Sequence, residues 1–304
     1  MTARLTVLVP TFNEEVNLSQ CLGSIMGWAD QVFVVDSFST DRTVEIARAM
    51  GATVVEHKFD GYADQKNWAM DTLPFRNEWL LILDADEYVT PELRDEIASL
   101  IAQDGNGCDG FYINRRFIFY DKWIKHCGWY PSWNLRLFRH ALGRYESRPV
   151  DEHILLNGRT GFCQAEMIHR DLHDMTWWIA KHNHYASLNA IAYEQIERGE
   201  SSESRIRPRL FGSQPERRRY LKENVWRHLP GRGLLYFVYM YFFCLGFLDG
   251  RMGFVFCAMH GIFEYFKVIK CWEAQHLDKL RPVQHEAIRE SAPATANAGS
   301  VRSH

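Results

Sequence analysis

Two aspartates, Asp84 and Asp86, stand one residue apart at the end of the stretch WLLILDADE, directly after five apolar residues. Side chains at positions i and i+2 of an extended chain share a face, so the two carboxylates would repel each other unless a cation lay between them. Carboxylate oxygens are ligands of Mg²⁺ and Mn²⁺, and such an ion can neutralise a diphosphate and activate it as a leaving group. The pair predicts a divalent metal site, with an acidic approach to the next helix as the alternative.

Short apolar runs alternate with helical patterns over the first 103 residues. The runs are LTVLV, QVFVV, ATVVEH and WLLIL; helical stretches span about 14–26, 41–50 and 65–72, and a last helix has Thr90 as its N-cap and Pro91 in its first turn. This alternation predicts an α/β fold, a doubly wound, mostly parallel sheet with helices on both faces. Ligands of such sheets bind beyond the carboxyl ends of the strands, which here read PTFNEE, DSFST and DADE.

Glycine loops that cradle phosphates are not found at these strand ends. The single GxGxxG match, at Gly105, Gly107 and Gly110, follows a helix and precedes a strand, whereas a dinucleotide fingerprint follows a strand and opens a helix. The sequence also has no GxxxxGK[ST] motif. A bound diphosphate would therefore need another source of positive charge, and a metal ion on the aspartate pair supplies one.

The remaining chain predicts an acceptor half, a membrane-associated segment and a tail. Strand-like aromatic pieces occupy about 111–163, and the region from there to about 200 has a helical appearance. We expect a catalytic domain over 1–204, with a nucleotide-sugar half (1–103) and an acceptor half (104–204), then a basic and apolar helical segment over 205–275. The small polar residues of 276–304 predict a disordered tail.

Residues 205–232 hold nine Lys or Arg against two Glu, and the apolar run 234–248 follows at once. This run of about 15 residues is shorter than the roughly 20 that span a bilayer, and the next one, 254–266, is interrupted by His260 and Glu264. The order predicts a re-entrant or interfacial hairpin beside anionic lipid, with a buried helical pair as the alternative.

Composition narrows the class of protein. A formal net charge of -3 argues against a surface built for nucleic acid, so no nucleic-acid partner is expected. The seven cysteines include no CxxC pair, which favours a reducing compartment over a disulfide framework or a zinc ribbon. The amino terminus lacks the regions of a signal peptide, so we expect the chain to start inside the cell.

The motifs VPTFNEE, VVDS, QKNWA and LILDADE together resemble the catalytic domain of glycosyltransferase family 2, which has the GT-A fold. The resemblance covers roughly residues 4–100. It implies a nucleoside pocket, a hydrogen bond from the base to Asp36, a ribose near Asp84 and a metal ion on Asp86. The spacing of the two aspartates predicts Asp84 as a second ligand of that ion. The other residues that it places near the donor are Pro10, Thr11, Asn13, Glu14, Lys66 and Asn67. A helix-capping carboxylate is the alternative role for Asp36.

The second half, with GWYPSWNLRLFRH, RPVDEHIL and GFLDGRMGF, resembles the lipopolysaccharide-core β-glucosyltransferase subgroup. That subgroup has Val-His-Glu where this chain has Val150, Asp151 and Glu152. The resemblance implies that Glu152 is the general base, and Asp151 would face the other way if this piece is extended. His169 could complete the metal or diphosphate site, and Trp129, Tyr130 and Arg136 could bind the acceptor. Core packing, structural hydrogen bonds and surface ion pairs are the alternatives.

These observations predict a metal-dependent, inverting glycosyltransferase that uses Mg²⁺ or Mn²⁺. The donor would be a nucleotide diphosphate sugar, with UDP-glucose suggested by the subgroup resemblance. The acceptor would be a lipopolysaccharide-core or lipid-linked saccharide at the cytoplasmic face of the inner membrane. A sugar nucleotidyltransferase would need a glycine-rich first strand end, and a non-catalytic saccharide-binding protein of this fold would show no metal-dependent nucleotide binding.

Overall fold

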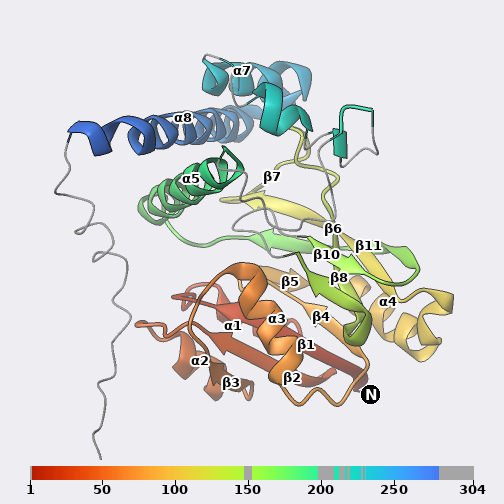
Figure 1. The fold of residues 1–304 in the computed structure, drawn as a ribbon. Coiled ribbons are helices and arrows are strands. Elements are labelled where there is room, and N and C mark those ends of the chain that lie inside the picture. The colour runs from red at the N-terminus through yellow and green to blue at the C-terminus, as the bar shows by residue number, and fades with distance from the viewer. Residues whose placement is uncertain are drawn as a thin grey trace, which may run out of the picture.

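The computed structural model of the chain describes residues 2–146, 153–197, 209–211, 216–217, 220–226, 229 and 231–280. Figure 1 shows a central twisted sheet with helices around its amino-terminal half, and with α5, α7 and α8 gathered on one side of the molecule.

Parallel strands form the amino-terminal half of the sheet. They lie in the order β3 (Thr53–Glu56), β2 (Ala29–Asp36), β1 (Ala3–Thr11) and β4 (Trp79–Ile82). The helices that connect or follow them are α1 (Leu18–Gly23), α2 (Thr43–Ala49), α3 (Tyr62–Thr72) and α4 (Pro91–Ala102). The predicted cap is confirmed, because the backbone N–H of Leu93 donates to Thr90 Oγ1 at 3.2 Å.

Both faces of this half-sheet are buried, which is why its strands are continuously apolar. Val7 and Val9 of β1 pack in a cluster with residues of α1, α2 and α4, whereas Leu8 packs with residues of α3 on the opposite face. The doubly wound arrangement predicted from the sequence is therefore confirmed.

The second half of the sheet is mixed. After β4 come β8 (Trp133–Arg139), antiparallel to β4; β6 (Gly110–Phe119), antiparallel to β8; β11 (Thr160–Arg170), parallel to β6; and β5 (Glu87–Val89), antiparallel to β11. Three short strands complete the set: β7 (Lys122–Trp123), which pairs with β6, and β9 (Gly143–Tyr145) and β10 (Ile154–Leu156), which pair with each other.

The expectation of helix from about residue 163 is wrong for residues 163–170, which belong to β11. Gln164, Ala165, Glu166 and Met167 are good helix formers, but β6 and β5 pair with this segment on its two sides. Pairing across the sheet overrides local propensity here. The helical pattern is confirmed further on, where α5 spans Met175–Glu197.

A helical hairpin follows the sheet domain and α5. It comprises α7 (Arg232–Val238), a π-helical turn (Tyr239–Phe243), a 3₁₀ turn (Gly246–Asp249) and α8 (Gly250–Leu280). The helices α7 and α8 touch backbone to backbone, since a Cβ added at Gly233 would lie 2.6 Å from the carbonyl oxygen of Gly261. In Figure 1 α8 lies between α7 and α5.

The buried carboxylate of Asp249 joins the tip of this hairpin to the sheet domain. It accepts hydrogen bonds from the backbone N–H of His126 at 2.8 Å and of Lys125 at 3.3 Å, and it pairs with His126 Nδ1 at 2.9 Å. The segment Gly246–His276 is long and apolar enough to cross a membrane by length and composition, and a third of its most apolar window is buried in the protein. The domain boundary expected near residue 204 lies outside the described residues.

Two buried histidines at the contact between α5 and α8 make stability depend on pH. Burial lowers the pKa of His182 to about 4 and that of His260 to about 3, whereas an unfolded histidine has a pKa of about 6.5. Between pH 6.5 and about 4 the unfolded chain binds protons that the native protein does not, so the free energy of unfolding should fall as the pH falls. Each histidine should contribute up to about 1 kcal/mol per pH unit.

Urea unfolding at pH 7.5, 6.0 and 5.0 measures this effect. His260→Gln should have a shallower pH dependence than the wild type, whereas His276→Gln, which changes an exposed histidine of the same helix, should not. If the free energy of unfolding depends on pH equally in all three proteins, burial of His260 does not contribute to the pH dependence of stability.

Candidate active site

The chain turns directly after β4, and this turn separates the two aspartates. The backbone N–H of Glu87 donates to the Asp84 carbonyl at 2.9 Å, and the Asp84 N–H donates to Glu87 Oε2 at 3.0 Å. The idea that both carboxylates share one face of an extended chain is therefore wrong. Asp84 and Asp86 enter different environments, and each has its own cationic neighbours.

Asp84, whose side chain is 36% exposed, lies in a charge cluster with buried cations, one of which also pairs with the buried Glu87. Arg136 Nη2 lies 2.5 Å from Asp84 Oδ2 and 2.7 Å from Glu87 Oε1, while Lys66 Nζ lies 3.6 Å from Asp84 Oδ1. Arg115 Nη1 contacts the same Glu87 oxygen at 3.0 Å. The carboxylates of Asp84 and Glu87 are thus compensated by three cations that come from α3, β6 and β8.

These cations keep both acids ionised. Burial alone would raise the pKa of Asp84, but the charges of Arg136 and Lys66 outweigh burial and hold it well below its usual range. Burial likewise raises the pKa of Glu87, but the charges of Arg136 and Arg115 and the hydrogen bond with His169 together outweigh burial and lower that pKa to about 2. Since cations already occupy both oxygens of Asp84, the predicted role of Asp84 as a metal ligand gains no support from these contacts.

Asp86 differs from Asp84 because one of its oxygens lacks a partner. Its Oδ2 lies 3.5 Å from His169 Nε2 and 4.0 Å from Lys181 Nζ, while its buried Oδ1 has no hydrogen-bond partner in the described part of the protein. A buried acceptor without a partner costs about 1–3 kcal/mol, so it marks a place where a ligand is expected.

The surroundings of Asp86 fit a hard divalent cation. Among the described residues no group of three His, Cys, Asp or Glu is arranged to hold a metal ion by itself. Mg²⁺ and its analogues are commonly held by one or two carboxylates plus substrate phosphates and water, so Asp86 with His169 beside it suffices for such a site. Burial lowers the pKa of His169, but the charge of Asp86 and the hydrogen bond and charge of Glu87 together outweigh burial and raise that pKa.

The predicted nucleoside residues meet at the carboxyl ends of β1 and β2. Asp36 is fully buried: its Oδ1 accepts from Thr11 Oγ1 at 2.9 Å and from Ser39 Oγ at 2.6 Å, and its Oδ2 accepts from the Ser39 N–H at 2.7 Å. Asn13 Oδ1 accepts from the Thr40 N–H at 2.8 Å. Asp36 therefore closes the turn after β2 and does not cap α2, which begins at Thr43, so the helix-capping alternative is wrong. Base recognition by Asp36 stays a prediction.

Two aromatic residues at this edge were missed by sequence reasoning. Phe12 follows the partly buried Pro10 and Thr11 at the end of β1, Phe38 follows β2, and more than half of each side chain is exposed. Phe38 also has a positive φ of 60°, which is unusual for a bulky residue. The sequence signal that could have found them is an aromatic residue inside a polar motif at the end of a strand. The polar neighbours of such a residue indicate that its side chain is not buried in the core.

Glu14 connects the nucleoside side to the Asp86 side. Burial and the neighbouring charge of Asp86 raise the pKa of Glu14 to about 7, and its Oε2 accepts from Asn17 Nδ2 at 2.8 Å. Asn17 Nδ2 also donates to Asp171 Oδ1 at 3.1 Å, so the end of β1 is joined to the chain that leaves β11.

Other predicted residues have structural partners. Asn67 exchanges two hydrogen bonds with the backbone of Tyr145, Tyr130 donates to Glu166 at 2.7 Å, and Trp129 packs against Phe256 of α8. Their predicted contacts with donor or acceptor stay predictions, as does an acceptor contact for the buried Arg136. The residues predicted as base, Asp151 and Glu152, lie outside the described residues.

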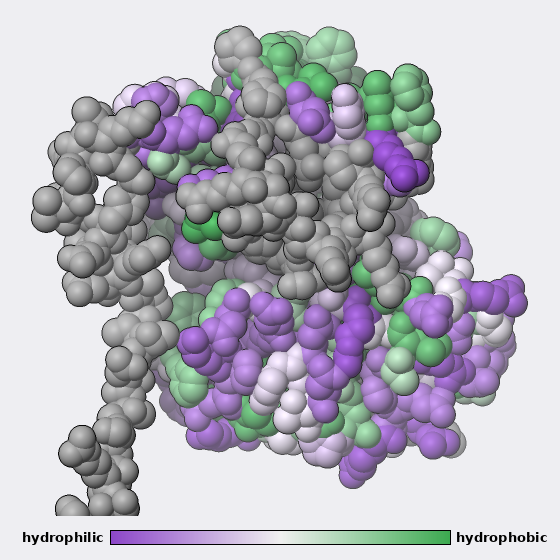
Figure 2. Space-filling view, in the orientation of Figure 1, coloured by the Kyte–Doolittle hydropathy of each residue, from purple (hydrophilic) through white to green (hydrophobic). Residues whose placement is uncertain are grey.

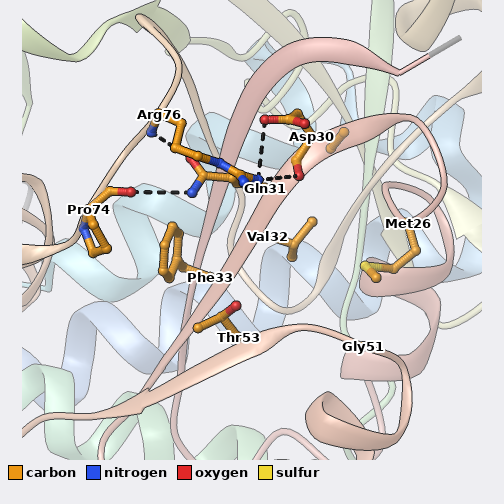
Figure 3. A pocket seen from close by; sticks show the side chains of 10 residues that line it. Met26, Asp30, Gln31, Val32, Phe33, Gly51, Thr53, Pro74 and Arg76 are labelled. Atoms are coloured by element: carbon orange, nitrogen blue, oxygen red, sulfur yellow. Dashed lines mark hydrogen bonds and ion pairs between the residues drawn. The ribbon is translucent and has the colours of Figure 1, made fainter.

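A hollow of about 370 Å³ lies at the other end of the sheet. Residues of the amino-terminal part of β2 and of neighbouring loops line it (Figure 3). Gln31 Nε2 donates to the Pro74 carbonyl at 3.2 Å, and Gln31 Oε1 accepts from the Arg76 N–H at 2.7 Å. It is not part of the strand-end site, because the carboxyl end of β2 is at Asp36.

A parallel half-sheet of order β3-β2-β1-β4, with acidic residues at its carboxyl ends and Asp86 in the turn after β4, is consistent with the GT-A fold. Residues 6–154 match the family model described as Glycosyl transferase family 2. This part of the chain is therefore similar to glycosyl transferase family 2.

Similar proteins are consistent with this family. An "Uncharacterized glycosyltransferase" of Rickettsia bellii is 41% identical over 102 residues, which cover 34% of this chain and 34% of the relative. The glycosyltransferase SunS of Bacillus phage SPbeta is 28% identical over 101 residues, which cover 33% of this chain and 24% of the relative. The chain thus spans about a third or less of the length of these relatives.

One solved structure is similar along most of the chain. The mannosyltransferase PcManGT from Pyrobaculum calidifontis, in complex with GDP-Man and Mn²⁺, has a TM-score of 0.52 at 16% identity. The similarity covers 90% of this chain and 88% of that chain, and at this identity it shows the fold alone.

Removing the central cation of the buried cluster should destabilise the domain. Arg136→Met should lower the free energy of unfolding by up to about 3–5 kcal/mol, because it removes the cation that bridges Asp84 and Glu87 and leaves each acid with one remaining cation. Urea unfolding at pH 7.5 measures this. Arg42→Met, which removes an exposed ion pair with Glu45, should leave the free energy of unfolding almost unchanged. A similar loss in both variants would contradict a structural role for the cluster.

Proposed function

We propose that this protein is a metal-dependent, inverting glycosyltransferase that moves a hexose from a nucleotide diphosphate sugar to a lipopolysaccharide-core or lipid-linked saccharide. The observation that carries the proposal is that Asp86 Oδ1, beside His169 and within the segment that matches the family 2 model, has no hydrogen-bond partner among the described residues. UDP-glucose is the donor that the subgroup resemblance favours.

Asp86 and His169 would hold Mg²⁺ or Mn²⁺, which supplies positive charge for the diphosphate of the donor. Asp84 would face the ribose, held in place by Arg136 and Lys66. The acceptor hydroxyl attacks the anomeric carbon as Glu152 takes its proton, and the bond from that carbon to the nucleotide diphosphate breaks. General base catalysis of this kind contributes about 10²–10⁴-fold.

Calorimetric titration of UDP into the full-length protein, with and without Mn²⁺, tests the donor site. We expect metal-dependent binding that weakens at least about 100-fold in Asp86→Ala, because a metal ligand is lost. The matched control is Asp95→Ala, which removes an exposed aspartate of α4 and should bind as the wild type does.

If wild type binds none of UDP, GDP, dTDP and CDP with Mn²⁺, the transferase proposal fails and the non-catalytic saccharide-binding alternative gains support. Binding that is equal in wild type and Asp86→Ala would contradict the metal role of Asp86. A sugar nucleotidyltransferase would instead be revealed by release of pyrophosphate from a nucleoside triphosphate and a sugar phosphate.

We also propose that the hairpin rests on the cytoplasmic face of the inner membrane. Large apolar side chains of the hairpin are exposed, among them Leu234 at 70% and Phe243 at 77%. Figure 2 shows hydrophobic side chains gathered at the top of the molecule, where Figure 1 places α7, over a mainly hydrophilic lower half. The excess of Lys and Arg in 205–232 precedes this hairpin in the chain, which favours an anionic lipid surface.

Co-sedimentation with vesicles tests this placement. The double variant Leu234→Asp/Phe243→Asp should bind vesicles of phosphatidylglycerol and phosphatidylcholine at least about tenfold more weakly than wild type, because burying each side chain is worth about 1.5–3 kcal/mol. Phe162→Asp, which changes an exposed aromatic residue of β11, is the control and should bind normally. Equal binding by all three proteins would place the membrane contact elsewhere.

A further inference from the structure

Lys181, in the second turn of α5, lies next to Asp86, the aspartate proposed to bind the metal ion, although α5 is not part of the sheet. Its Nζ lies 4.0 Å from Asp86 Oδ2, 3.6 Å from Asp171 Oδ2 and 4.0 Å from the centroid of the Trp177 ring. Both carboxylate distances exceed the roughly 2.7–3.2 Å of an N–H···O hydrogen bond. The ammonium group is therefore attracted to these acids while its protons are still able to bind another acceptor.

Lys181 is also the cation of this site that solvent reaches most easily. Its side chain is 27% exposed, against 6% for Lys66 and 7% for Arg136, both of which pair with Asp84. Arg115 is 20% exposed and its guanidinium pairs with the buried Glu87. A ligand that arrives from solvent meets Lys181 before these buried cations.

The surroundings of Lys181 hold it in a fixed position. The rings of His173 and Trp177 stack with centroids 3.8 Å apart and planes within 2°, and His173 Nδ1 pairs with Asp171 Oδ1 at 2.7 Å. One turn beyond Lys181, the hydroxyl of Tyr185 lies 2.8 Å from that of Tyr62 at the start of α3. Helix α5 is thus joined to both sides of the strand-end site, so the cation is positioned before any ligand binds.

We propose that Lys181 binds the diphosphate of the donor once a divalent cation occupies Asp86. The proposal rests on the function proposed above. A metal ion on Asp86 neutralises the carboxylate that attracts Lys181, and the phosphate oxygens bring negative charge to the same place. The ammonium group then donates to a phosphate oxygen in a charge-assisted hydrogen bond, and it stabilises the negative charge that develops on the diphosphate as the sugar leaves.

Titrations that separate nucleotide from metal affinity test the role of Lys181. The probes are the diphosphate that wild type binds best among UDP, GDP, dTDP and CDP, the matching nucleoside, and Mn²⁺ alone. Lys181→Met should weaken the diphosphate about 10- to 100-fold in the presence of Mn²⁺, the range expected for a hydrogen bond to a charged group. It should leave the affinity for the nucleoside unchanged.

Affinity for Mn²⁺ alone provides a readout that a merely structural residue would not show. Removing Lys181 removes a positive charge beside Asp86, so Lys181→Met should bind Mn²⁺ as tightly as wild type or more tightly. Lys181→Arg keeps the charge and should retain diphosphate affinity to within about threefold. Lys122→Met, which removes an exposed lysine of β7, is the matched control and should behave as wild type.

Three results would overturn the inference. If Lys181→Met binds the diphosphate within twofold of wild type, the lysine does not contact it, although the donor site stands. Equal weakening of the diphosphate, the nucleoside and Mn²⁺ would reveal a structural role. If wild type binds no nucleoside diphosphate, the proposed function fails and the role of Lys181 fails with it.

Discussion

The ion pairs of one buried guanidinium, that of Arg136, hold the candidate site together. They join Asp84 from the end of β4 and Glu87 from the start of β5 to β8, the strand at which the sheet changes from parallel to antiparallel. Buried ion pairs give little net stability because desolvation offsets their attraction, but breaking one leaves an expensive uncompensated charge. The cluster therefore fixes the position of the parallel half of the sheet relative to the mixed half. It adds little net stability to either half.

This arrangement also divides the work between the two aspartates. With Asp84 committed to Arg136 and Lys66, the tight turn closed by Glu87 directs Asp86 toward His169 of β11. The backbone N–H of Arg170 donates to the Asp86 carbonyl at 2.8 Å, so β11 fixes the main chain of Asp86 as well as its neighbour. Asp84 is thus held by the cations of Arg136 and Lys66, while Asp86 Oδ1 has no hydrogen-bond partner in the described part of the chain.

Local signals made the first half of the fold predictable. The four parallel strands bury both faces, and Thr90 with Pro91 marks a helix start by short-range chemistry alone, so both could be read from neighbouring residues. The strand β11 could not, because its partners β5 and β6 lie far away in the sequence and its residues favour a helix. For the same reason the sequence could name Arg136 and Asp84 but could not pair them, and it assigned Arg136 to the acceptor instead.

Several aromatic residues of the second half pack together between the candidate site and the helical hairpin. Phe117 of β6 lies 4.9 Å from the ring of His169 and 5.3 Å from that of Phe256 in α8, and Phe256 lies 4.4 Å from His260. A continuous row of rings therefore runs from the neighbour of Asp86 into the hairpin, while Asp249 fixes the hairpin tip to the loop after β7. Because protein interiors are close-packed and transmit displacement, this packing holds the hairpin in a fixed position relative to Asp86. A surface that holds the hairpin would thereby also orient the carboxyl edge of the sheet, which is the geometric requirement for a transferase whose acceptor is anchored in a membrane.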